Sequence, residues 1–293
     1  MDIKHIVISG GGPSILPAIS AIQYLNEQNI IDFNKIQSIY GTSAGAMIGA
    51  LICMRFDWET INDYILKRPW HDVFNITAQN IFEAYQKKGL FDRTIVDKIF
   101  HPLFLAKDIP FNITLKSFFE YSKIELHIFV FDVNNFITED LSYLTYPDML
   151  LLDAVFMSSS IPFFMTPTII ENKCYVDGGV CANYPLNYCL DSGKKIEEIL
   201  GIRNNYCDYQ KNMVDNNSTL FDFMFCMGYN IFNHYMNVPQ LKIKYEVLCN
   251  VNMLSLGYVN SFLNSFESRK EYHEKGFQSA KDFMQKHNSI LKP

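Results

Sequence analysis

The chain has 293 residues, 48% of them hydrophobic and 19% charged, and its formal net charge is −6. This composition excludes a disordered protein, and the lack of a long basic run argues against nucleic-acid binding. The seven cysteines contain no C-x-x-C pair, which predicts free thiols in the cytoplasm or another reducing compartment and no zinc site. Without a signal-peptide pattern or an uninterrupted apolar stretch of membrane length, we expect a soluble protein that can still touch a membrane surface.

The first 55 residues predict a β-α-β-α unit. A strand at His5–Ser9 leads into Gly10-Gly11-Gly12-Pro13-Ser14, and a helix at Ile15–Asn29 follows, with apolar residues at helical spacing. A second strand at Ile36–Tyr40 ends at the turn Gly41–Gly45, behind which a helix of small apolar residues begins. This alternation is typical of an α/β protein whose parallel sheet is covered by helices.

The middle of the chain continues this pattern. Residues 57–107 are predicted to be helical, and this stretch is a candidate cap over a site. We predict a strand at Glu125–Phe131, a helix at Asp148–Met157, a short hairpin that ends at Asp177, and a strand at Ile196–Ile202.

The C-terminal part, from about residue 201 to residue 293, is predicted to be mainly helical and to pack on the same single domain, 1–293. Its segment Thr219–Val238 is rich in Phe, Tyr and Met and is apolar almost all round. This pattern favours a helix buried in the core, and the alternative is a lipid-facing or membrane-contacting surface. Glu267–Lys286 is predicted to form a polar amphipathic helix that is solvated.

The pentapeptide Gly41-Thr42-Ser43-Ala44-Gly45 has the form G-x-S-x-G between a predicted strand and a predicted helix. A serine in such a tight turn has its hydroxyl pushed out of the backbone. The helix N-terminus behind it offers free N–H groups and a partial positive charge, which favour an alkoxide or a tetrahedral oxyanion. Ser43 is therefore a candidate nucleophile, and the alternative is a glycine-rich turn in which the serine has no chemical role.

Gly10, Gly11 and Gly12 follow the first strand and so lie at the same edge of a parallel sheet as the serine turn. Glycines let backbone N–H groups approach a ligand closely. Together with the N–H of Ala44 they predict an oxyanion hole, and the alternative is an ordinary tight turn from strand to helix. Two nucleotide motifs are excluded, because residue 15 is Ile where G-x-G-x-x-G needs glycine, and no G-K-[ST] follows.

Two kinds of residue are candidates for the base that takes the serine proton. Asp177 lies at a predicted strand end, and Gly178 and Gly179 after it let the chain turn away, although an ordinary D-G hairpin turn has the same pattern. A histidine would instead complete an α/β-hydrolase triad, and the downstream candidates are His234, His273 and His287. The order of elements disfavours that triad, because α/β-hydrolases place several strands before the serine and here only two precede it.

Gly10–Gly12, Gly41–Gly45 and Asp177–Gly179, in this order, resemble the motifs of the patatin-like phospholipase family. The resemblance covers about residues 5–200. Further segments that fit are Gly89–Asp92, Phe129–Val133, the serine-rich block Ser158–Phe164 and the D-G-G-x-x-x-N-x-P segment at Asp177–Leu186.

The resemblance implies a three-layer α/β fold with a mainly parallel central sheet and helices on both faces. It implies a phospholipase A type lipid acyl hydrolase that needs no metal or cofactor, with phospholipid or another acyl lipid as substrate and transient membrane contact. Ser43 would be the nucleophile and Asp177 the proton acceptor of a Ser–Asp dyad. The implied oxyanion hole consists of the backbone N–H groups of Gly11, Gly12 and Ala44, and the supporting motif glycines are Gly10, Gly41, Gly45, Gly178 and Gly179.

The first motif departs from the family pattern G-G-G-x-[RK]-G. This chain has Gly10-Gly11-Gly12-Pro13-Ser14, without the basic residue and the fourth glycine. The departure motivates one alternative function, a lipid-binding or interaction protein with a weak or inactive site. Another alternative is an esterase or thioesterase that acts on small acyl groups.

Overall fold

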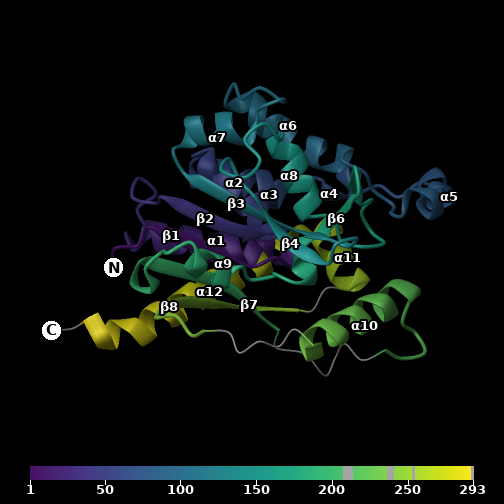
Figure 1. Cartoon of the computed structure of the whole chain (residues 1–293). Coiled ribbons are helices and arrows are strands. Elements are labelled where there is room, and N and C mark those ends of the chain that lie inside the picture. The colour runs from purple at the N-terminus through teal and green to yellow at the C-terminus, as the bar shows by residue number, and fades with distance from the viewer. Residues whose placement is uncertain (207–213, 236–240, 253–254, 292–293) are drawn as a thin grey trace.

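A mixed β-sheet runs through the centre of the molecule, and helices lie on both of its faces (Figure 1). The computed structural model describes residues 1–206, 214–235, 241–252 and 255–291. The strand order is β5-β6-β3-β2-β1-β7-β8, with β4 also paired to β3. The strands are His5–Ile8 (β1), Ser38–Thr42 (β2), Glu125–Asp132 (β3), Ile137–Leu141 (β4), Thr168–Ile170 (β5), Lys173–Asp177 (β6), Ile199–Tyr206 (β7) and Tyr245–Val251 (β8).

Strands β3, β2, β1, β7 and β8 run parallel to one another, whereas β4 and β6 run antiparallel to β3. The central strands of such a sheet are covered on both faces, so β1 and β2 are buried along their whole length rather than at alternate residues. In β1, Ile6 and Ile8 pack in the larger core, and Val7 packs in the smaller core on the other face. In β2, Ile39 packs in the larger core and Tyr40 packs in the smaller one.

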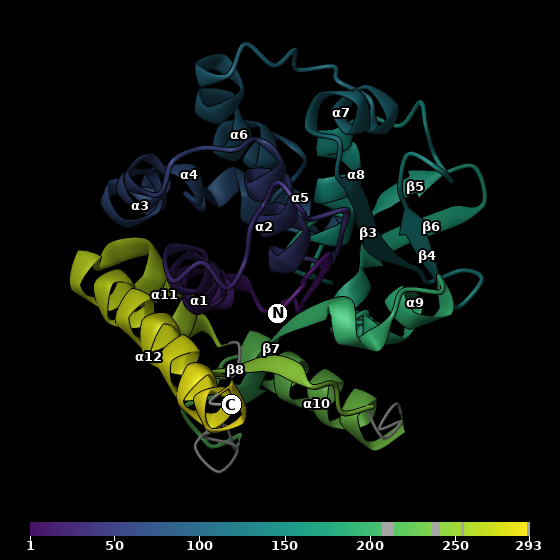
Figure 2. The ribbon, with the colours of Figure 1, turned by 90° about the vertical axis from the view of Figure 1, so that its left-hand side faces the viewer.

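The larger core lies under α1, α2, α8 and α12, and the smaller one lies under α9 (Figure 2). This arrangement confirms the predicted α/β fold with helices on both faces of a mainly parallel sheet. The α-helices are Ile15–Glu27 (α1), Ala44–Cys53 (α2), Trp58–Lys67 (α3), Trp70–Val73 (α4), Ala78–Lys87 (α5), Thr94–Ala106 (α6), Leu115–Ser122 (α7), Leu151–Ser158 (α8), Leu186–Asp191 (α9), Leu220–Tyr235 (α10), Leu256–Asn264 (α11) and Phe266–Leu291 (α12), and the short 3-10 helices are Gly12–Ser14 (η1), Gly178–Val180 (η2) and Ile196–Glu198 (η3).

Strand β3 brings two distant segments of the chain together. Residues 130–132 pair with β6 and also with β4, so these two strands lie on opposite edges of β3. Strand β4 also pairs with Phe129, whose other edge is occupied by Thr42 of β2. Strand β6 therefore lies on the β2 edge, directly beyond the end of β2. Because Asp177 pairs with Val130, the residue after Phe129, the ends of β2 and β6 meet.

Most predicted elements are present with shifted ends. The second strand is Ser38–Thr42 rather than Ile36–Tyr40, and the predicted hairpin before Asp177 is the antiparallel pair β5–β6. Strand β8 was not predicted from the sequence, where the C-terminal part is expected to be mainly helical. Alternate residues of β8 are buried from Val247 to Val251, but a period-two signal over one short segment is weak until its partner strand β7 is known.

The aromatic segment Thr219–Val238 forms α10 up to Tyr235, and its last residues lie outside the described ranges. Among the α10 side chains that the structure describes, none is buried, and Leu220, Phe223 and Met227 are exposed. The interpretation of this helix as part of the core is therefore wrong for these side chains. Within the described ranges, no helix combines the length and the apolar character that a membrane crossing requires.

The C-terminal helix α12 is solvated on its outer side only. It packs along α1 and β8, and Tyr272, Ala280 and Phe283 are buried. His273 of α12 forms a hydrogen bond of 2.6 Å through Nδ1 with the Ser20 hydroxyl of α1. The predicted amphipathic character is thus confirmed, and its apolar side closes the larger core.

Candidate active site

Ser43 stands in a strained turn between β2 and α2. Its backbone has φ 54° and ψ −120°, a conformation that L-residues rarely adopt and that stores strain at functional sites. A Cβ added at Gly45 would lie 2.3 Å from the carbonyl oxygen of Ile8, and one at Gly41 would lie 2.5 Å from the carbonyl oxygen of Gly45. The two glycines are required because β1, β2 and the start of α2 touch through their backbones.

Ser158, at the end of α8, holds the turn in place. The Ser43 N–H donates a hydrogen bond of 2.9 Å to Ser158 Oγ, which in turn donates to the carbonyl oxygen of Phe129 at 2.6 Å. Two residues on, the carbonyl oxygen of Ser160 accepts a 2.9 Å hydrogen bond from the Asp177 N–H. The serine-rich block thus supports both Ser43 and Asp177. The sequence analysis matches this block to a family motif but assigns it no role.

Asp177 is buried and contacts the serine. Its carboxylate lies close enough to the Ser43 hydroxyl for the two groups to interact, and it accepts the Gly179 N–H at 2.7 Å. Burial raises the pKa of Asp177 from its ordinary 3.8 to about 7, although the hydrogen bonds from Ser43 and Gly179 act in the opposite direction. A carboxylate with a pKa near neutrality is a stronger base than an ordinary aspartate.

The histidines considered as alternatives have other partners. His273 bonds with Ser20, and the two ring nitrogens of His287 lie 2.9 Å from the carbonyl oxygen of Phe283 and 2.8 Å from that of Lys244. The side chain of His234 lies outside the described part of the structure. The structure therefore places Asp177, and neither of the two described histidines, in contact with Ser43.

The glycine loop after β1 lies beside the serine turn. Gly12 has φ 55°, which favours glycine, and Gly12 and Ala44 line the same cavity as Ser43. The N–H of Gly10 donates to the carbonyl oxygen of Asn183 at 3.0 Å, which ties this loop to the segment that follows Asp177. Gly12 and Ala44 thus belong to the wall of the cavity, next to the candidate nucleophile.

Asn204 of β7 supports the loop at the point where the family's basic residue is missing. Its Nδ2 donates to the carbonyl oxygen of Gly10 and to Ser14 Oγ, both at 2.7 Å. A Cβ added at Gly11 would lie 2.4 Å from this nitrogen and 2.2 Å from Ser14 Oγ, so the loop is closely packed there. Sequence reasoning misses Asn204, because nothing local marks an asparagine 190 residues from its partner Ser14.

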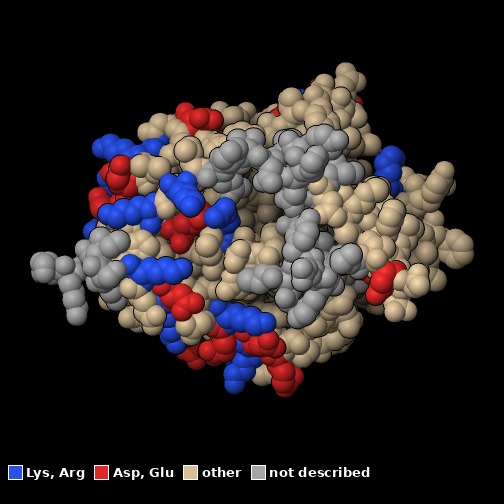
Figure 3. Space-filling view, turned by 90° about the horizontal axis from the view of Figure 1, so that it is seen from below, with Lys and Arg blue, Asp and Glu red and all other residues tan. Residues whose placement is uncertain are grey.

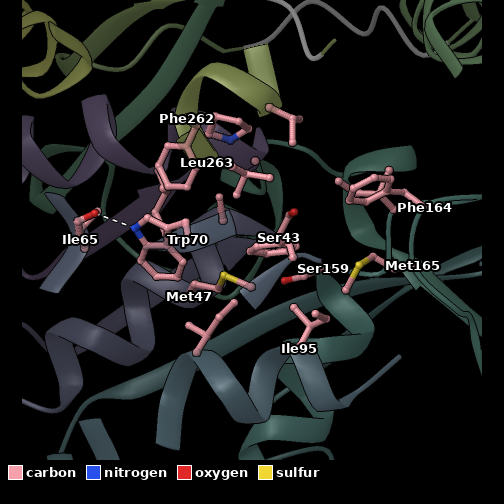
Figure 4. Close-up of a pocket in the computed structure, with 18 of the residues that line it drawn as sticks. Ser43, Met47, Ile65, Trp70, Ile95, Ser159, Phe164, Met165, Phe262 and Leu263 are labelled. Carbon is pink, nitrogen blue, oxygen red and sulfur yellow. Dashed lines mark hydrogen bonds between the residues drawn. The ribbon is translucent and has the colours of Figure 1, made fainter. Parts of the chain in front are cut away.

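An apolar cavity of about 150 Å³ opens at Ser43. Figure 4 shows Trp70 and Phe262 on one side of the serine, and Phe164 and Met165 on the other. The Trp70 indole is fixed by a 2.7 Å hydrogen bond to the carbonyl oxygen of Ile65. Helices α3, α4 and α6 from the predicted cap contribute to the wall, together with α11. Such an apolar lining suits an apolar part of a ligand.

In the part of the chain that the structure describes, His, Cys, Asp and Glu side chains do not gather in groups of three that could hold a metal ion.

The family model of the patatin-like phospholipases matches residues 6–190. The chain belongs to this family. The match confirms the resemblance inferred from the three glycine-containing motifs, and it covers β1 to α9, the segment that carries both Ser43 and Asp177.

Two viral proteins are similar to this patatin-like chain. A probable lipid hydrolase of Invertebrate iridescent virus 6 is 26% identical over 217 residues, which cover 72% of this chain and 73% of the viral protein. An uncharacterized protein of Acanthamoeba polyphaga mimivirus is 25% identical over 249 residues, covering 83% of this chain and 80% of that protein.

Among solved structures, VipD from Legionella pneumophila has a TM-score of 0.57 at 15% identity, with 98% of this chain and 67% of VipD covered. The type III effector protein ExoU of Pseudomonas aeruginosa has a TM-score of 0.50 at 13% identity, with 99% of this chain and 54% of ExoU covered. At these identities the likeness shows the fold alone.

The contacts of Ser158 lead to a first prediction. In Ser158→Ala, the Ser43 N–H and the Phe129 carbonyl lose their buried partner, so we expect the free energy of unfolding to fall by about 1–3 kcal/mol and the turnover number to fall with it. Ser160→Ala is the matched control, because that hydroxyl bonds only the Phe156 carbonyl of the preceding helix α8. Urea unfolding and ester hydrolysis measure both effects. A larger loss in the Ser160 variant would contradict the positioning role.

The raised pKa of Asp177 leads to a second prediction. Between about pH 4 and pH 7 the folded protein keeps a proton that the unfolded chain has lost, so this group lowers the stability as the pH rises through that window. Asp177→Asn removes the effect. We expect the variant to match the wild type near pH 4 and to exceed it at pH 8 by at most ~4 kcal/mol in free energy of unfolding. Urea titrations at both values measure this, and a pH-independent difference would refute the assignment.

Proposed function

We propose that this chain hydrolyses fatty-acyl ester bonds of phospholipids through an acyl-enzyme on Ser43, with Asp177 as the general base. The observation that carries the proposal is the contact between the Ser43 hydroxyl and the buried Asp177 carboxylate at an apolar cavity. Membership of the patatin-like phospholipase family and the similarity to a probable lipid hydrolase support a hydrolase that acts on lipids.

In the first step, Ser43 Oγ attacks the carbonyl carbon of the ester while its proton passes to Asp177. The carbonyl oxygen becomes an oxyanion, which the N–H groups of Gly11, Gly12 and Ala44 would stabilise together with the N-terminus of α2. Removing one such donor typically costs about 2.7–4 kcal/mol of transition-state stabilisation. A Ser–Asp pair depends strongly on these donors, because an aspartate at its ordinary pKa is a far weaker base than an imidazole and the raised pKa of Asp177 only brings it level.

In the second step, the bond between the carbonyl carbon and the leaving oxygen breaks, and the departing alcohol takes the proton from Asp177. Water then attacks the acyl-enzyme and gives its proton to Asp177. The carbonyl re-forms as the bond to Ser43 Oγ breaks, and the serine recovers the proton as the fatty acid leaves. Asp177 thus serves as base and acid in turn, which suits a group whose pKa lies near neutrality.

The cavity supports an acyl lipid as the substrate. Its wall is apolar around Trp70, Phe164 and Phe262, where an acyl chain would lie. Near the serine it carries the Ser159 hydroxyl, which is buried and has no hydrogen-bond partner in the described part of the chain. This hydroxyl is suited to donate to an oxygen of the bound ester. The apolar wall supports an ester with an acyl chain, and rates on soluble esters of increasing chain length separate a long-chain lipid from the small acyl groups of the esterase alternative.

The third prediction concerns the dyad. Ser43→Ala and Asp177→Asn should each lower fatty-acid release from mixed phospholipid vesicles by roughly a thousandfold or more, because nucleophile and base act as a unit. Circular dichroism checks that both variants fold. Fluorophosphonate labelling of wild type but not of Ser43→Ala would separate this enzyme from an inert lipid-binding protein. Undiminished release by either variant would refute the proposed mechanism.

The fourth prediction is the pH dependence. Since only the ionised carboxylate accepts the serine proton, kcat/KM should fall about tenfold for each pH unit below 7 and level off above it. A soluble acyl ester measured between pH 5 and pH 9 gives the profile, with enzyme returned to pH 8 as the control for irreversible loss. A flat profile across pH 6–8 would contradict Asp177 as the base.

A further inference from the structure

Helix α5 carries an apolar face that the rest of the described protein does not cover. All ten residues of α5 are described, and none is buried. Ala78, Ile81, Phe82 and Tyr85 follow one another at helical spacing and so lie on one face. Ile81 is 62% exposed, Phe82 85% and Tyr85 94%. A contiguous patch of large, solvent-exposed apolar side chains such as this one marks an interaction surface.

The polar side of α5 stabilises the helix by itself. The Thr77 side chain caps the N-terminus together with Asn80 in a capping box. Glu83 accepts a 2.6 Å hydrogen bond from Gln79 and forms a 2.6 Å ion pair with Lys87. These local contacts favour the helix without any cover over its apolar face. The exposed stripe is therefore a feature of an ordered amphipathic helix.

The chain that leaves α5 runs directly into the wall of the cavity. The N–H groups of Leu90 and Phe91 donate to the carbonyl oxygen of Phe164, and the Thr166 N–H donates back to that of Phe91. Phe164 lines the cavity at Ser43, and its neighbour Phe163 is 56% exposed (Figure 4). The apolar surface of α5 is thus linked through two or three residues to the wall of the acyl site.

On the face seen in Figure 3, the side of the molecule that carries α5 shows few charged side chains. The charged side chains gather instead on the left of that view. On the helix itself, Glu83 and Lys87 neutralise each other. A partner that binds here is selected by apolar contact rather than by charge.

We propose that the apolar face of α5, with Phe163, inserts into the surface layer of a phospholipid membrane and presents the cavity to the lipid. This inference rests on the proposed function, since the membrane is also the source of the substrate. Amphipathic helices lie in the membrane surface with their apolar face sunk about 5–10 Å. A second copy of the chain is a poorer occupant, because one short helical stripe is far smaller than the ~800 Å² per partner of a stable interface.

Flotation with vesicles tests the docking surface. The full chain carrying Ser43→Ala is mixed with phosphatidylcholine vesicles, so that no lipid is consumed, and compared with the same chain carrying Phe82→Ser and Tyr85→Ser. We expect the bound-to-free ratio to fall roughly tenfold or more in the second protein and to depend little on salt. Leu105→Ser is the matched control, since Leu105 is 61% exposed on α6, and it should change the ratio less than about twofold.

Equal flotation with and without the α5 substitutions, or an equal loss in the Leu105 control, would overturn the proposal. So would a lipid-free dimer that the α5 substitutions dissociate while flotation stays the same, since a second copy would then be the occupant. The same α5 substitutions in a chain that keeps Ser43 show whether they affect membrane docking or catalysis. The α5 variant should hydrolyse soluble p-nitrophenyl butyrate within about twofold of wild type and lose hydrolysis of vesicle lipid. If Ser43→Ala leaves hydrolysis intact, the proposed chemistry fails while the flotation result stands.

Discussion

The site depends on one edge of β3, which β2 and β6 share end to end. Strand β2 pairs up to Phe129 through Thr42, and β6 arrives from the opposite direction and ends with Asp177 opposite Val130. The hydrogen-bond register along β3 therefore fixes where β2 and β6 end. A shift by one residue would turn the side chains of either strand to the other face of the sheet, so the contact between Ser43 and Asp177 is as specific as the sheet itself.

This arrangement has a cost in stability that its surroundings offset. The carboxylate of Asp177 is buried, which disfavours its charge, and Ser43 is held in a strained backbone conformation. Ser158 bonds the backbones of Ser43 and Phe129, the Ser160 carbonyl accepts from the Asp177 N–H, and Asn204 supports the glycine loop. The same burial that destabilises the charged aspartate brings its pKa close to neutrality, where a carboxylate can both take and return a proton.

The cavity and helix α5 extend this chemistry toward a lipid. The wall at Phe164 is hydrogen-bonded to the segment that leaves α5, so the proposed acyl site and the proposed docking surface belong to one continuous part of the chain. An apolar cavity next to a nearly neutral apolar surface suits a molecule with a long acyl chain. The likeness to VipD and ExoU supports the fold, and the proposed chemistry rests on the residues of this chain.

The sequence by itself determined the β-α-β-α start and the family, because these depend on local patterns: strand and helix periodicity, and glycines where backbones touch. Through the motifs of that family it also predicted Ser43 and Asp177 as a pair. Tertiary structure alone decided which apolar segments are covered. The sequence of the aromatic helix α10 favours a buried helix, yet its Phe223 is exposed. The polar helix α12, in contrast, closes the larger core. Only the fold joined Asn204 to the glycine loop and placed β8 beside β7. Burial and long-range hydrogen bonds depend on what packs against a segment, and no local pattern encodes that partner.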